Sequence, residues 1–92
     1  MYPELEEMRE KILAIDHEMI ALLAQRLQYA ELIGKLKKEK KLPYEDATYF
    51  QFSLKVKQSY GQDLGLEPDE VKLFFELLQE LSINRMKKDV SL

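Results

Sequence analysis

The sequence of residues 5–40 is LEEMREKILAIDHEMIALLAQRLQYAELIGKLKKEK, a stretch with no proline and a single glycine. Its apolar side chains recur at alternating steps of three and four residues, the spacing of one face of a helix that packs lengthwise against others. The positions of this stripe are Leu5, Met8, Ile12, Ile15, Met19, Leu22, Arg26, Tyr29, Ile33 and Leu36. The pattern therefore predicts one continuous amphipathic helix over residues 5–40.

Arg26 is the exception in this stripe, because it stands where the pattern requires an aliphatic side chain. Lys37 follows it by eleven residues and so lies only about 20° away around the helix. An unpaired cation that is buried costs several kcal/mol. Each of the two therefore needs a carboxylate partner such as Asp46, a position at the rim, or an anionic ligand, and the residues alone leave these alternatives open.

A second helix is predicted over residues 46–60. Pro43 cannot continue the first helix, Asp46 is a favourable N-cap residue, and Gly61 is a plausible left-handed stop. The aromatic and β-branched residues of 49–54 would also suit a strand. We favour the helix because the capping residues bracket it.

A third helix is predicted over residues 67–88, where Pro68 occupies the first turn and acidic residues surround it. Its apolar stripe is Val71, Phe74, Phe75, Leu78 and Leu81. Ser82 lies on the same face, where a hydroxyl either bonds to the carbonyl one turn earlier or contacts a ligand. The predicted fold is thus all-α, with three helices in a single domain that covers residues 1–92.

The composition excludes several classes of function. The 92 residues include no cysteine and carry a formal net charge of -3, which argues against disulfide-stabilised folds, thiolate metal sites and nucleic-acid binding. No stretch approaches the roughly 20 apolar residues of a membrane span, and no signal peptide is recognised, so a cytoplasmic location is expected. Since phosphate-binding loops, Ser/His/Asp sets and His/Cys clusters are missing from the sequence, hydrolytic, redox and metal chemistry are not predicted either.

The length of the first helix predicts a second chain. A helix of about 35 residues spans roughly 50 Å, whereas a compact globule of this size has a radius of gyration of about 12 Å. The helix must therefore extend beyond its own domain, and its apolar stripe is most simply covered in a two-fold homodimer. An antiparallel arrangement would bring Arg9 of one chain towards Arg26 and Lys37 of the other, a set of cations that suits a small dicarboxylate.

These features together resemble a known family. The segment MREKILAIDHEMIALLAQRLQYAELIGKLKKEKKLP of residues 8–43, with Asp46 after it and Ser82 in the third helix, is similar to the all-helical (AroQ-class) chorismate mutases. The resemblance covers nearly the whole chain. It implies an intertwined three-helix homodimer with two active sites, each built from both chains.

The resemblance also implies a reaction, the Claisen rearrangement of chorismate to prephenate on the route to phenylalanine and tyrosine, without cofactor or metal. Arg26 and Arg9 of the partner subunit would hold the two carboxylates of the substrate, and Lys37 would face the ether oxygen. Asp46 would lie near the ring hydroxyl and Ser82 near the ring carboxylate. Catalysis would then depend on positioning and fixed charges.

Three substrate-binding positions depart from the family pattern. Tyr49 and Phe50 stand where the family has an Arg-Glu pair, and Met86 stands where it has Gln or Glu. Phe50 has no atom that accepts a hydrogen bond, and Met86 has no donor. Loss of a donor to a developing charge commonly lowers the rate about 10²- to 10³-fold.

The chain is accordingly interpreted as a chorismate mutase, an isomerase whose activity these three substitutions reduce. Two alternatives remain. One is an isochorismate-pyruvate lyase, a related enzyme type that carries an apolar residue at the position of Phe50. The other is a non-catalytic binding or regulatory module with the same fold.

Overall fold

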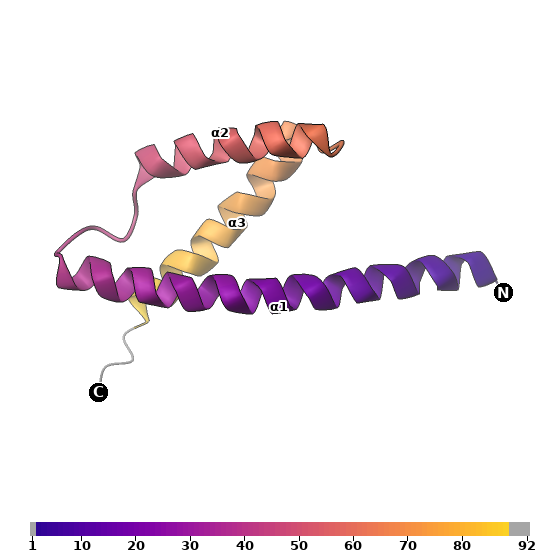
Figure 1. Cartoon of the computed structure of the whole chain (residues 1–92), viewed down its shortest axis with the longest axis horizontal. Coiled ribbons are helices and arrows are strands. Elements are labelled where there is room, and N and C mark those ends of the chain that lie inside the picture. The colour runs from indigo at the N-terminus through magenta and orange to yellow at the C-terminus, as the bar shows by residue number, and fades with distance from the viewer. Residues whose placement is uncertain (1, 89–92) are drawn as a thin grey trace.

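The computed structural model describes residues 2–88, which form three α-helices and, within that range, no strand. The helices are α1 (Pro3–Glu39), α2 (Ala47–Asp63) and α3 (Pro68–Lys87) (Figure 1). The prediction of an all-α fold with one very long helix is confirmed, and the alternative of a strand in the second segment is wrong. Each predicted boundary lies within three residues of the observed one.

The ends of α1 follow from its charges and its backbone. Pro3 occupies the first turn with acidic residues beside it, and lysines occupy the last turn, so both ends complement the helix dipole. Beyond Glu39 the chain leaves the helix through Lys41, whose φ of 58° is left-handed. The amide of Leu42 then donates to the carbonyl of Lys37 at 2.8 Å, the six-to-one bond of a Schellman motif. This turn directs the chain towards α2.

The start of α2 was predicted correctly, but its end was not. Asp46 caps the helix, its side chain accepting a hydrogen bond from the amide of Tyr49 at 3.0 Å. The predicted stop at Gly61 is wrong, because the helix continues to Asp63 and the left-handed residue is Gly65, with φ of 87°. Gly61 is instead buried against α3: a β-carbon there would lie 2.7 Å from Cγ2 of Val71.

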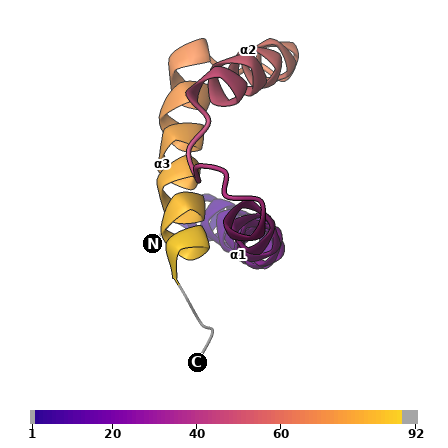
Figure 2. The same cartoon turned by 90° about the vertical axis from the view of Figure 1, so that its left-hand side faces the viewer.

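α3 is the element that joins the other two helices (Figures 1 and 2). It begins with a capping box in which Glu70 accepts from the amide of Glu67 at 2.8 Å. Its last turns pack on α1, where Gly34 permits the close approach: a β-carbon there would lie 2.8 Å from the Cα of Met86. Within residues 2–88 the buried apolar side chains are few, namely Leu27, Ala30, Leu54, Val71 and Ile83.

The chain is extended, with a radius of gyration of 16.9 Å and dimensions of 57 × 33 × 14 Å. The N-terminal half of α1 projects away from α2 and α3 (Figure 1). Its stripe is exposed, as Ile12 at 57% and Leu22 at 61% illustrate. Within residues 2–88, no helix has the length and apolar character that crossing a membrane requires.

Candidate active site

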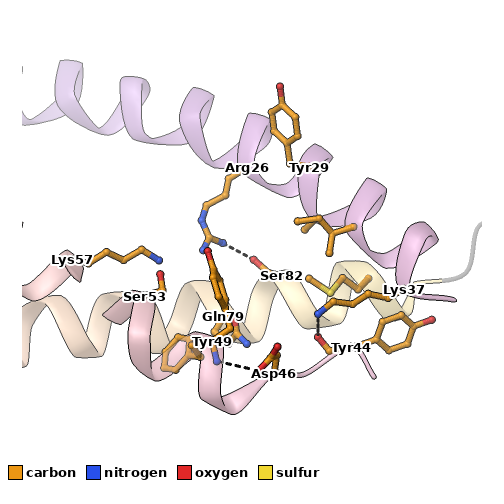
Figure 3. A pocket seen from close by; sticks show the side chains of 14 residues that line it. Arg26, Tyr29, Lys37, Tyr44, Asp46, Tyr49, Ser53, Lys57, Gln79 and Ser82 are labelled. Atoms are coloured by element: carbon orange, nitrogen blue, oxygen red, sulfur yellow. Dashed lines mark hydrogen bonds between the residues drawn. The ribbon is translucent and has the colours of Figure 1, made fainter. Parts of the chain in front are cut away.

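A pocket lies between the three helices, with a volume of about 480 Å³ (Figure 3). This is within the range of sites that hold small molecules. α1 contributes Arg26, Tyr29, Ala30, Ile33 and Lys37. The loop before α2 and α2 itself contribute Tyr44, Asp46, Tyr49, Phe50, Ser53 and Lys57, and α3 contributes Gln79, Ser82 and Met86. Within each helix these positions are one, three or four residues apart, so each helix presents one face to the pocket.

Arg26 extends from α1 towards α3, where its Nη1 donates to Oγ of Ser82 at 2.5 Å. Ser82 is 4% exposed, so this hydroxyl is a fixed acceptor rather than a mobile surface group. Burial lowers the pKa of Arg26 from its ordinary value, yet a guanidinium remains charged at neutral pH. The side chain is thus a positioned cation with further donors for a ligand.

Lys37 lies at the other end of the pocket (Figure 3) and donates from Nζ to the main-chain oxygen of Tyr44 at 2.8 Å. The pairing with Asp46 that the sequence left open is not formed. Asp46 instead uses one carboxylate oxygen to cap α2. The ammonium of Lys37 is therefore held by a neutral group rather than by a carboxylate.

Seven of the eight residues predicted from the sequence line this one pocket: Arg26, Lys37, Asp46, Tyr49, Phe50, Ser82 and Met86. Arg9 does not. It lies on the projecting half of α1, is largely exposed, and pairs with Glu6 of the same helix at 3.1 Å. Within one chain, nothing brings Arg9 near the pocket.

The polar residues of the pocket that the prediction did not assign to the site include Ser53, Lys57 and Gln79. The helical spacing places these residues on the same helix faces as the predicted site residues. Ser53 and Lys57 continue the face of α2 that begins at Asp46, and Gln79 precedes Ser82 by three residues on α3.

Lys57 is partly buried, and its Nζ lies 4.3 Å from the centre of the Phe75 ring, a cation–π contact. Burial lowers its pKa, and the positive charge of Arg26 lowers it further. The pocket thus contains three cations and one carboxylate, in a chain whose net charge is -3. This local excess favours an anionic ligand. Among the described residues, no group of His, Cys, Asp or Glu side chains could hold a metal ion.

Comparison with known protein families gives a match to chorismate mutase type II over residues 8–87. The chain belongs to this family. The matched range includes α1 from residue 8 onward, all of α2 and α3, and every residue of the pocket, and it confirms the resemblance seen in the sequence. A comparison with curated individual proteins finds no match.

Proposed function

We propose that this chain is a chorismate mutase that converts chorismate to prephenate. The observation that carries the proposal is the pair of cations in the pocket, Arg26 and Lys37, each held by a neutral acceptor. Among residues 2–88, neither forms a salt bridge with a carboxylate. Their charges are therefore available to a small dicarboxylate.

The rearrangement is unimolecular: the ether C–O bond breaks while a C–C bond forms between the enolpyruvyl methylene and the ring. The enzyme needs to hold the compact conformer and to stabilise the negative charge that develops on the ether oxygen. In the proposed site Arg26 binds a carboxylate and Lys37 faces the ether oxygen. Positioning of this kind can lower a barrier by up to about 7–11 kcal/mol.

A second copy of the chain completes the proposed site. Arg9 would approach the pocket of the partner subunit and bind the other carboxylate, in an intertwined homodimer with two shared active sites. The exposed apolar stripe of residues 5–22 supports this arrangement, because a monomer would leave it in water. We place the enzyme in the cytoplasm, at the branch that leads to phenylalanine and tyrosine.

The lining of the pocket also supports the proposal that the mutase activity is reduced. Phe50 and Met86 are half-buried in its lining and offer neither the acceptor nor the donor that the family pattern supplies. Tyr49, at the rim, offers a phenol in place of a guanidinium. The apolar ring of Phe50 favours one second candidate, the lyase that splits isochorismate into salicylate and pyruvate.

One assay separates these functions: chorismate and isochorismate are supplied in turn, and the products are identified. Prephenate from chorismate supports the mutase, whereas salicylate with pyruvate from isochorismate identifies the lyase. Arg26→Ala should abolish either reaction, and Lys35→Ala, an exposed lysine on the same helix, should change neither. Chorismate that binds and is not consumed would indicate a binding module.

A further inference from the structure

Lys57 and Ser53 have no role in the proposed rearrangement, although both line the pocket. Lys57 and Ser53 lie together at one end of it, on the α2 side, while Arg26 descends towards that end from α1 (Figure 3). Lys37 occupies the opposite end of the same pocket. A ligand that fills the pocket would therefore meet a cation from α2 as well as those from α1.

The groups at this end come from all three helices. Ser53 and Lys57 are one turn apart on α2, Gln79 and Ser82 are three residues apart on α3, and Arg26 is on α1. Ser53, Lys57 and Gln79 are all half-buried. They offer a hydroxyl, an ammonium and an amide, which together can donate several hydrogen bonds to one carboxylate.

The charges at this end are not balanced by the chain. Arg26 is bonded to a neutral hydroxyl, and Lys57 contacts the face of Phe75. Among the described residues, no carboxylate forms a salt bridge with either. Arg26 and Lys57 carry like charges, and the charge of Arg26 adds to the effect of burial in lowering the pKa of Lys57. An anion between them would remove this repulsion, so the arrangement is more favourable with a ligand than without one.

We propose that Lys57 binds the ligand together with Arg26, both contacting one carboxylate, with Ser53 and Gln79 supplying neutral hydrogen bonds at the same end. The inference rests on the proposed function for the identity of the ligand, a small dicarboxylate. It implies that the polar contacts of this site are displaced: they are missing at Phe50 and Met86 and present about two turns away along the same helices, at Lys57 and Gln79. The chain thereby fixes which end of the pocket receives a carboxylate without help from the partner subunit.

The main experiment measures the Kd of chorismate by calorimetry for the unmutated protein and for Lys57→Met. Methionine preserves the length and the contact with the Phe75 ring but removes the charge. The affinity should fall at least about tenfold, the effect of one charged hydrogen bond. Lys57→Arg should retain most of the affinity. Lys55→Met, which changes an exposed lysine on the same helix, is the matched control and should bind as the unmutated protein does.

Sharing of one carboxylate predicts that the effects of Lys57 and Arg26 are coupled. Arg26→Gln combined with Lys57→Met should weaken binding less than the product of the two single effects, because either change already removes part of one shared contact. Multiplicative effects would place the two cations on different groups of the ligand. Unchanged affinity in Lys57→Met would overturn the proposal outright.

A second readout keeps this inference separate from the proposed function. Malonate, a simple dicarboxylate, is titrated while NMR follows the side-chain signals of Lys57 and Lys55. The Lys57 signals should shift in a saturable way and those of Lys55 should not. If chorismate is neither converted nor bound and this shift persists, the mutase proposal fails and the anion site stands. If chorismate is converted but neither ligand shifts the Lys57 signals, the mutase proposal stands and the proposed role of Lys57 fails.

Discussion

The two halves of α1 differ in what covers them. The C-terminal half packs against α3 through Leu27, Ala30 and Gly34 and carries Arg26 and Lys37 into the pocket. The N-terminal half has the same apolar periodicity and no covering element within the described chain (Figure 1). One helix therefore contains a buried segment that organises a site and a bare segment that needs a partner. Chain mixing and measurements of assembly can test whether the bare half completes the site of another chain.

The largest effect is expected from a mixture of two inactive variants. Arg9→Ala and Arg26→Ala should each lower chorismate turnover by at least about 10²-fold, because each removes a cation from both sites of the dimer. When the two variants are mixed at equal amounts and allowed to exchange chains, half of the dimers are hybrids with one intact site. Activity should then return to about a quarter of that of the unmutated enzyme.

The control for this experiment mixes Arg9→Ala with a double variant that carries both Lys35→Ala and Arg26→Ala. Lys35 is exposed, so its substitution should leave the recovered activity unchanged. Recovery shows that Arg9 and Arg26 act from different chains. If Arg9→Ala alone is fully active, the bare half of α1 has no role in the site.

A charge placed on the bare half should break the dimer. Ile12→Asp puts a carboxylate on the stripe of both chains, and burying an unpaired charge costs several kcal/mol. We expect the dissociation constant measured by analytical ultracentrifugation to rise by at least about 100-fold. His17→Asp, which adds a carboxylate off the stripe, should have little effect. A protein that is monomeric before any substitution would refute the shared site.

Substitutions in the covered half of α1 should change the free energy of unfolding rather than the dissociation constant of the dimer. Gly34→Ala introduces a β-carbon only 2.8 Å from the Cα of Met86, so α3 must move away from α1. The free energy of unfolding should fall by about 1–3 kcal/mol, measured by urea denaturation at fixed protein concentration. The exposed residue Gln28 provides the control, since Gln28→Ala should change stability by less than about 0.5 kcal/mol.

Comparison of sequence and structure shows which signals are local. The stripe of α1, the Asp46 cap and the Pro68 start depend on neighbouring residues, and all were predicted. The end of α2 was misplaced because two glycines, Gly61 and Gly65, satisfy the same local rule, and only the packing of Val71 on Gly61 distinguishes them. Lys57 was missed because its contact with Phe75 and its proximity to Arg26 arise from the packing of helices far apart in the sequence.

The smallest expected effect concerns the pH dependence of folding. The pKa of Lys57 is lower in the folded chain than its ordinary value of 10.5, because of burial and then Arg26. As the pH rises from the pKa of Lys57 in the folded chain towards its ordinary pKa, the folded chain loses the ammonium proton while the unfolded chain retains it. Folding therefore becomes more favourable over this range. The stability of the unmutated protein relative to Lys57→Met should therefore increase with pH in this window. Urea denaturation in steps from about pH 8 to about pH 11 measures this difference.

Comparison with Lys57→Met matters here, because the reference pKa values of tyrosine and lysine side chains lie in this range and both proteins contain the same other residues. Lys55→Met again serves as the control and should show no such divergence from the unmutated protein. A difference that stays constant with pH would mean that Lys57 is as well solvated in the folded chain as in the unfolded one. The charge of Lys57 would then not disfavour folding in the absence of a ligand. Repulsion between Arg26 and Lys57 would be negligible in the folded chain.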